Sequence, residues 1–200
     1  MPHLLSGPAL RYPSRMGTAF ATGPRDATVG ADPVPAIGDS TEMDELIKVR
    51  VHPPSGTIVL QRPEKRNALT RLMLLQVQQA FDDLHQERKV RAVILTGAGA
   101  AFCAGVDMAE VHATFSAEDA LEQWHRDTLQ LKQLFETMLR FPKPIIAAVN
   151  GPAVGPGAGL VLASDIVLGT PGAQFGLPEP KRGLVAGIVS PLLAFRVGAG

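Results

Sequence analysis

The chain has 200 residues and an apolar share of 46%, so it is long enough for one globular domain with a sizeable core. Its 19 basic and 19 acidic residues cancel, which argues against binding nucleic acid or an anionic membrane through overall charge. Cys103 is the only cysteine, which excludes an internal disulfide and a zinc site built on several thiolates, and indicates a reducing compartment. No apolar run reaches the roughly 20 residues of a membrane helix, so we expect no membrane span.

The first 45 residues are rich in proline, glycine, alanine and serine, and they show no helical or strand periodicity. We expect residues 1–45 to form a disordered or targeting extension and residues 46–200 to form the folded core. Two interpretations of the extension stay open. The arginine-containing, acid-free stretch before Asp26 suggests a mitochondrial transit peptide and hence the mitochondrial matrix. Alternatively, Met43 is the true start and the protein is cytoplasmic, which we prefer.

The core alternates short apolar strands with amphipathic helices. Strands are predicted over residues 46–51, 57–60, 92–96, 145–149 and 165–168. Helices are predicted over residues 70–85 with Thr70 as the cap, over about 116–141 beginning at Ser116, and near Leu160. The runs at 92–96 and 145–149 are continuously aliphatic and are therefore expected to be buried. This order indicates an α/β fold of parallel strands.

Two glycine-containing loops follow the predicted strands at 92–96 and 145–149. The first reads AFCAGVDM over residues 101–108, and the second reads NGPAVGPGAG over residues 150–159. Each places backbone N–H groups after a buried strand, and the second leads into a helix N-terminus. The two loops can therefore converge on one ligand.

Two charged segments could add chemistry to these loops. Glu179 ends the stretch QFGLPE, and a carboxylate among apolar neighbours is a candidate general base, because desolvation raises the pKa of such a group. A surface glutamate after a proline is the plainer alternative. In RPEKRNAL, the cations of Arg62, Lys65 and Arg66 either bind phosphates or form a solvated cluster.

Together these segments resemble the crotonase (enoyl-CoA hydratase/isomerase) family. The matching blocks are RPEKRNAL, AVILTG with AFCAGVDM, KPIIAAVNGPAVGPGAGLVLASDIVLGTPGAQFGLPE and KRGL, and they extend from about residue 46 to the end. The resemblance implies an α/β, ClpP/crotonase-like spiral of β-α-β units that assembles as homotrimers or hexamers. It also implies acyl-CoA thioesters as substrates, with no further cofactor. Members of the family normally continue beyond the equivalent of Gly200 into a helical C-terminal part.

The resemblance also assigns catalytic roles in stabilising a thioester enolate. Val106 would donate the first backbone N–H, whereas the second donor position falls on Pro156, which has no N–H, so Gly157 would have to donate instead. Glu179 matches one of the two glutamates that hydratases use, and the other falls on Gly159. A single carboxylate suits moving a proton between two carbons better than adding water. We therefore expect an isomerase-like enzyme. A non-catalytic acyl-CoA-binding protein and a hydratase that holds its water by other groups remain as alternatives.

Substrate contacts follow from the same resemblance. Lys65 and Arg66 would bind the CoA phosphates, with the backbone around Ala68 and Ala104 near the adenine and the pantetheine arm. The remaining positions expected to bind substrate lie in the two glycine-containing loops: Gly105, Val106, Asp107, Met108, Val154 and Gly155.

Other conspicuous residues are expected to be structural. Trp124, Phe135 and Met138 lie on a segment that borders the acyl chain in this family, but core packing is the plainer expectation for each. Cys103 has no histidine placed to activate it, so we expect it to fill space. No metal is predicted, because three histidines lack partners at ligand spacing: His85, His112 and His125.

Overall fold

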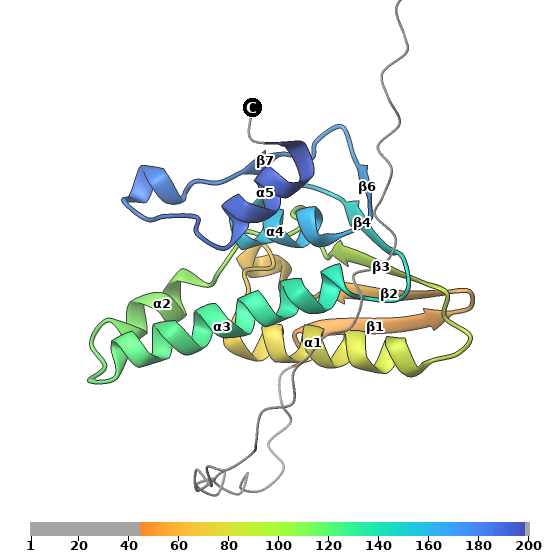
Figure 1. Cartoon of the computed structure of the whole chain (residues 1–200), viewed down its shortest axis with the longest axis horizontal. Coiled ribbons are helices and arrows are strands. Elements are labelled where there is room, and N and C mark those ends of the chain that lie inside the picture. Colours follow the sequence, from red (N-terminus) through yellow and green to blue (C-terminus); the bar gives the residue numbers. More distant parts are fainter. Residues whose placement is uncertain (1–44, 199–200) are drawn as a thin grey trace, which may run out of the picture. The chain divides into compact units, whose positions relative to one another are not determined.

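The computed structural model describes residues 45–198, so the predicted extension lies outside the described residues apart from Glu45. A five-stranded sheet forms the centre of this part of the chain (Figure 1). Its first two strands, β1 (Ile47–His52) and β2 (Ser55–Leu60), pair antiparallel as the predicted hairpin. The sheet then continues in parallel through β3 (Ala92–Gly97), β4 (Ile145–Val149) and β6 (Ile166–Gly169). A separate small parallel sheet joins β5 (Ala153–Val154) to β7 (Phe175–Gly176).

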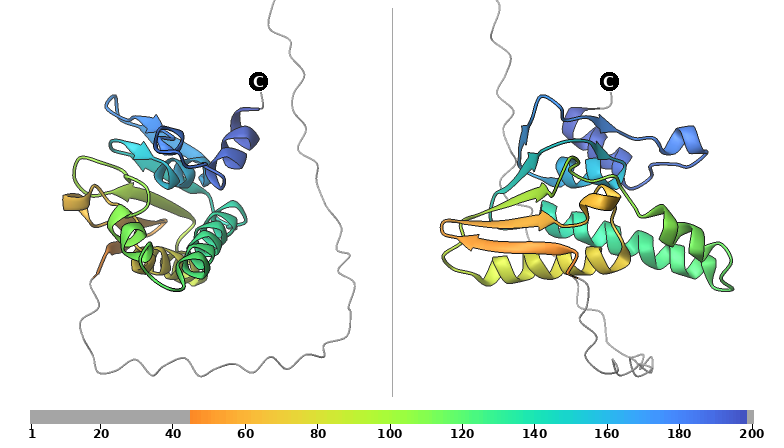
Figure 2. Two further views of the ribbon diagram at one scale, coloured as in Figure 1. Left: turned by 90° about the vertical axis from the view of Figure 1, so that its left-hand side faces the viewer. Right: turned by 180° about the vertical axis from the view of Figure 1, so that it is seen from behind.

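Five α-helices and two short 3₁₀ helices connect the strands within the described residues. They are η1 (Pro63–Lys65), α1 (Arg71–Gln86), α2 (Met108–Thr114), α3 (Ala120–Leu139), α4 (Pro156–Ala163), η2 (Glu179–Arg182) and α5 (Val189–Val197). Helices α1 and α3 lie side by side and form a layer next to the sheet (Figures 1 and 2). The start of α1 is as predicted, because the Thr70 hydroxyl accepts a hydrogen bond of 3.1 Å from the backbone N–H of Met73.

The core fills the space between the sheet and these helices. Along β2, β3 and β4 every second side chain is buried, and these include Ile58, Leu95 and Ile145, each with no exposed surface. The apolar stripe of α1, with Val77 and Phe81 at its centre, packs against them. The predicted strands at 92–96 and 145–149 are therefore buried on one face only, since their alternate residues remain half-buried.

The α/β fold with parallel strands is confirmed, but several details of the prediction are wrong. The expected helix over about 116–141 is α3, which begins at Ala120, so Ser116 lies exposed before it instead of capping it. Helix α2 lies before the predicted range and was not predicted. The two-residue strands β5 and β7 and helix α5 were not predicted. No helix among residues 45–198 is long and apolar enough to cross a membrane.

Candidate active site

The loops that follow β3 and β4 meet beyond the carboxyl ends of the strands, as predicted. Cys103 and Ala153 form a parallel bridge, and the N–H of Val154 donates to the carbonyl of Cys103 at 2.9 Å. The N–H groups of Phe102 and Cys103 both donate to the carbonyl of Pro152 at 3.1 Å. These bonds hold the two glycine-containing loops against each other, so groups from both loops can face one small volume.

Val106 presents a backbone N–H that makes no hydrogen bond within residues 45–198. Its neighbours are occupied, because the carbonyl of Gly105 accepts from the N–H of Leu69 at 2.7 Å and the N–H of Asp107 donates to the carbonyl of Leu69 at 2.8 Å. In an extended chain successive N–H groups point to opposite sides, so the N–H of Val106 points away from Leu69. It has no acceptor among the described residues.

The second loop places a proline opposite Val106. Pro156 is the first residue of α4, and its ring lies against Gly105, where a Cβ would be 3.4 Å from Pro156 Cδ and 2.9 Å from the carbonyl oxygen of Val154. Gly105 also has φ = +90°, which favours glycine. Gly157 has an N–H in the first turn of α4, where no intrahelical acceptor exists, but it is buried behind Pro156 against the carbonyl of Cys103.

Glu179, the first residue of η2, completes the wall of a small cavity of about 70 Å³. Its Oε2 is buried and has no hydrogen-bond partner among the described residues. Its Oε1 lies against Gly155, where a Cβ would come within 2.5 Å of it. The residues that line the cavity come from both loops and from the segment around η2: Ala104, Gly105, Val106, Met108, Val154, Gly155, Pro156, Pro178, Glu179 and Leu184.

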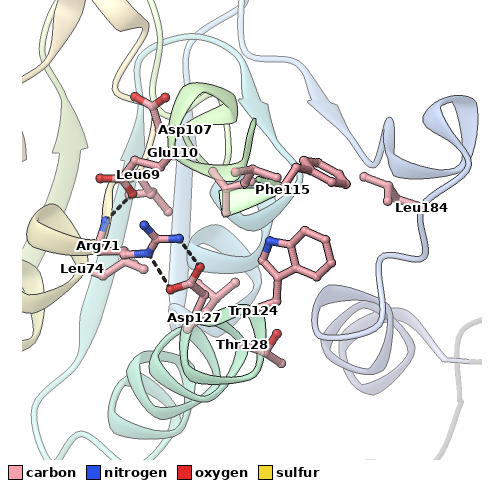
Figure 3. Close-up of a pocket in the computed structure, with 13 residues that line it drawn as sticks. Leu69, Arg71, Leu74, Asp107, Glu110, Phe115, Trp124, Asp127, Thr128 and Leu184 are labelled. Atoms are coloured by element: carbon pink, nitrogen blue, oxygen red, sulfur yellow. Dashed lines mark hydrogen bonds and ion pairs between the residues drawn. The ribbon is translucent and has the colours of Figure 1, made fainter. Parts of the chain in front are cut away.

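A larger pocket of about 300 Å³ adjoins this cavity and shares Val106 and Leu184 with it. Figure 3 shows Phe115, Trp124 and Leu184 on one side of the pocket and Leu69, Arg71 and Leu74 on the other. Trp124 therefore lines a pocket, and the expectation that it packs in the core is wrong. Phe135 and Met138 are core residues as expected, at 3% and 2% exposure.

One side of the larger pocket carries a bidentate ion pair. Nε and Nη2 of Arg71 each donate to a carboxylate oxygen of Asp127 at 2.7 Å, and Nη2 also donates to the hydroxyl of Thr114 at 2.8 Å. The hydrogen bond from Arg71 holds the pKa of the Asp127 carboxyl below its ordinary value, and the same bond raises the pKa of Arg71. Both groups therefore stay charged around neutral pH.

Arg62 and Asp107 form a second ion pair, which sequence reasoning missed. Nη1 of Arg62 donates to Asp107 Oδ2 at 2.9 Å and to the carbonyl of Ala68 at 2.6 Å, and both side chains are largely buried. Burial alone would raise the pKa of the Asp107 carboxyl, but the hydrogen bond and charge of Arg62, with the N–H groups of Ala109 and Glu110, lower it. Arg62 is therefore neither a phosphate ligand nor a solvated cation. The sequence did contain a signal for this ion pair. Arg62 and Asp107 have opposite charges and lie in loops that follow the neighbouring strands β2 and β3.

Asn67 is a further residue that sequence reasoning missed. It is fully buried, its amide nitrogen donates to the carbonyls of Ala98, Ala101 and Phe102, and its Oδ1 accepts from the N–H of Arg62 at 2.9 Å. It thereby ties the loop before α1 to the first glycine-containing loop.

Several predicted substrate-binding residues lie outside the small cavity. Lys65 and Arg66 are exposed on the loop before α1, and the carbonyl of Arg66 accepts from the N–H of Ala104 at 2.9 Å. Ala68 is half-buried, and Asp107 lines the larger pocket. The structure thus brings Ala104, Gly105, Val106, Met108, Val154, Gly155, Pro156 and Glu179 together, and leaves Lys65, Arg66, Ala68 and Gly157 off the cavity wall.

Cys103 adds no reactive group to this site. Burial raises the pKa of the Cys103 thiol to about 12, so it stays protonated and fills space, as expected. Among residues 45–198, no group of three or more histidine, cysteine, aspartate or glutamate side chains is placed to hold a metal ion.

Comparison with known proteins identifies relatives of this chain. Residues 56–199 match the family model for enoyl-CoA hydratase/isomerase. The chain is 46% identical over 143 residues to a Thermus thermophilus protein named "Putative enoyl-CoA hydratase", covering 72% of this chain and 56% of that protein. It is 34% identical to the 1,2-epoxyphenylacetyl-CoA isomerase of Escherichia coli, covering 72% of this chain and 54% of that enzyme.

Solved structures show the same likeness. The enoyl-CoA hydratase of Bacillus anthracis superposes with a TM-score of 0.72 at 32% identity, covering 78% of this chain and 60% of that one. The chain spans about half the length of the curated relatives that it matches. The family match over most of the sequence, together with the shared fold, shows that the chain belongs to the enoyl-CoA hydratase/isomerase (crotonase) family.

Proposed function

We propose that this chain acts on acyl-CoA thioesters by forming an enolate and moving a proton between two carbons of the acyl group, with Glu179 as the single base. One observation carries the proposal. The buried, unpartnered Oε2 of Glu179 and the unused N–H of Val106 belong to residues that line the same cavity of about 70 Å³. A base and an oxyanion donor in so small a space can act on adjacent atoms of one substrate.

The reaction would need no group beyond these residues and the substrate. Glu179 takes the proton from the carbon next to the thioester carbonyl, and the electron pair of the broken C–H bond moves onto the thioester oxygen. The N–H of Val106 stabilises the negative charge there. When the acyl group carries a β,γ double bond, the resulting dienolate accepts the same proton from Glu179 at the γ carbon. The double bond then lies beside the thioester, and no atom is gained or lost.

Addition of water fits this site less well. Hydratases of the family use a second glutamate at the position of Gly159, and a side chain there would collide with the ring of Phe135. Gly159 and Phe135 are both buried, so the ring fills the space that a carboxylate would need. A hydratase mechanism would therefore have to hold its water with groups other than a carboxylate at position 159.

The CoA moiety would bind outside the cavity wall. Lys65 and Arg66 are exposed on the loop whose backbone holds Ala104, so their cations can reach phosphates while the thioester enters beside Val106.

Assembly as a homotrimer also remains a proposal, supported by exposed apolar side chains on β6 and α5 such as Ile166, Leu168 and Phe195. Light scattering on the purified protein would measure its oligomeric state.

Proton exchange tests the proposal directly. An acyl-CoA incubated with the protein in heavy water should gain deuterium at the carbon next to the thioester, as followed by mass spectrometry. Glu179→Gln should slow this exchange by about a hundredfold or more. Glu118→Gln, which alters an exposed glutamate, serves as the matched control and should leave the rate unchanged. Full exchange in Glu179→Gln would overturn the assignment of the base.

Two further outcomes would redirect the proposal. Tight binding of an acyl-CoA without any exchange would favour the non-catalytic acyl-CoA-binding alternative, which the missing N–H of Pro156 motivates. Conversion of an enoyl-CoA mainly into its 3-hydroxyacyl product would favour the hydratase alternative.

A further inference from the structure

The indole of Trp124 places an unused hydrogen-bond donor in the larger pocket. Its Nε1 is buried and has no partner among the described residues, although the ring lines the pocket. The ring packs edge-to-face on Phe115, with centroids 4.9 Å apart at 75°, which holds it in one orientation. In Figure 3 the nitrogen lies on the edge of the ring that faces the Arg71–Asp127 pair.

We infer that Trp124 selects acyl groups that carry a neutral oxygen acceptor remote from the thioester, and that its Nε1–H donates to that oxygen. This inference rests on the proposed function, since it names the acyl-CoA class that the same site would take. The indole N–H is a donor only, so its partner must be an acceptor. A buried donor left unpaired is costly, whereas a ligand that supplies the acceptor removes that cost.

Neighbouring side chains do not supply this acceptor. Asp127 already accepts three hydrogen bonds, two from Nε and Nη2 of Arg71 and one from the amide of Gln123, and none from Trp124. The hydroxyl of Thr114 donates to the carbonyl of Glu110 and accepts from Arg71. Since no described residue accepts from Trp124 Nε1, we expect the acceptor to come from the occupant of the pocket.

The charges around the pocket favour a neutral acceptor over a carboxylate. Three carboxylates, those of Asp107, Glu110 and Asp127, line the pocket with only one cation, Arg71. Arg71 is committed to Asp127, and Asp107 is balanced by Arg62. An anionic acyl group would meet a negative surface with no spare cation, whereas a ketone, hydroxyl or ether oxygen carries no such penalty.

The position of Trp124 also indicates where the oxygen lies on the acyl chain. Trp124 lines the larger pocket but not the cavity that contains Glu179. A chain that leaves the thioester beside Val106 enters the larger pocket past Val106 and Leu184, which the two spaces share. The acceptor is therefore several carbons beyond the reacting positions.

Binding of matched ligands to the full chain tests this inference without relying on turnover. Octanoyl-CoA and its 5-, 6- and 7-oxo derivatives would be titrated by calorimetry against the wild type and Trp124→Phe. For at least one oxo ligand, the affinity relative to octanoyl-CoA should fall about tenfold in Trp124→Phe, the usual range for one net hydrogen bond. Leu184→Ala, which removes apolar surface from the pocket but no donor, is the matched control and should weaken all four ligands alike.

Tryptophan emission gives an independent reading in the wild type, because Trp124 is the only tryptophan of the chain. The favoured oxo ligand should shift the emission, while octanoyl-CoA should produce a smaller change. If Trp124→Phe weakens the oxo ligands and octanoyl-CoA by the same factor, the inference is wrong while the proposed function stands. If none of the four ligands binds the wild type, the proposed function fails, and this inference fails with it.

Discussion

The loops after β3 and β4 meet at one cavity, but only the first of them presents a free backbone N–H to it. The first loop is anchored by the buried Asn67 amide and by the Arg62–Asp107 ion pair, and it leaves the N–H of Val106 unused. The second loop turns directly into α4, whose first residue, Pro156, has no N–H to offer. In the proposed mechanism the site would therefore have one prearranged oxyanion donor, and most of the stabilisation of an enolate should depend on Val106.

Removing the N–H of Val106 should have the largest effect. Val106→Pro should lower the rate of α-proton exchange by about a hundred- to a thousandfold, the usual loss for an oxyanion donor. The substitution breaks no internal hydrogen bond, since this N–H has no acceptor among the described residues. Val106→Ala keeps the donor and is the control. Equal rates in the two variants, with unchanged thermal unfolding, would show that Val106 is not the donor.

Adding a backbone N–H to the second loop should increase the rate of α-proton exchange. Pro156→Gly and Pro156→Ala both restore an N–H at the first position of α4, and each should raise the exchange rate by about tenfold to a hundredfold. Because glycine and alanine differ in backbone freedom but share the N–H, a gain in both variants assigns the effect to the donor. No gain in either would mean that Gly157 or another group already serves the oxygen.

The anchoring of the first loop predicts a change in stability. Arg62→Ala leaves the buried Asp107 carboxylate unpaired and should lower the free energy of unfolding by about 2 to 3 kcal/mol, measured by urea denaturation. Arg126→Ala removes ion pairs to Asp119 and Glu122 on the surface of α3 and should cost less than about 1 kcal/mol. Equal losses in the two variants would contradict a special role for the buried pair.

The smallest expected effect is a dependence of stability on pH. The pKa of Asp107 is lowered in the folded chain, so its contribution is complete above the ordinary aspartate pKa of about 3.9 and is lost as pH falls through the lowered value. The free energy of unfolding of the wild type should exceed that of Asp107→Asn by about 1.5 kcal/mol at pH 7. This difference should shrink below about pH 4. A difference that does not vary down to pH 2 would argue against this linkage.

Local sequence patterns predicted most of the sheet, because β1 alternates apolar and polar residues while β2, β3 and β4 are mainly apolar runs. Helix α2 was not predicted, because its seven residues are too few to show a clear apolar periodicity. The parallel order of the strands predicted that the two loops converge. It did not predict which side chains of these loops pair with each other. Arg62 read as a surface cation because its partner Asp107 is 45 residues away in the chain.

The location of Trp124 also could not be predicted from local sequence. Its spacing on α3 fitted a core stripe, and about two and three turns further along the helix Leu131 and Leu134 are buried in the core. Whether an aromatic residue faces a core or a pocket depends on how far the opposite elements extend, which a single sequence does not encode locally.

The contact between Gly159 and Phe135 constrains how this site could acquire new chemistry. A glutamate at position 159 would strike the ring, while a smaller residue at position 135 alone would leave a void in the core. Neither substitution is acceptable by itself, yet together they exchange an aromatic ring for a carboxylate in the same volume. The two positions are thus coupled, and placing a carboxylate at position 159 should require a paired change at position 135.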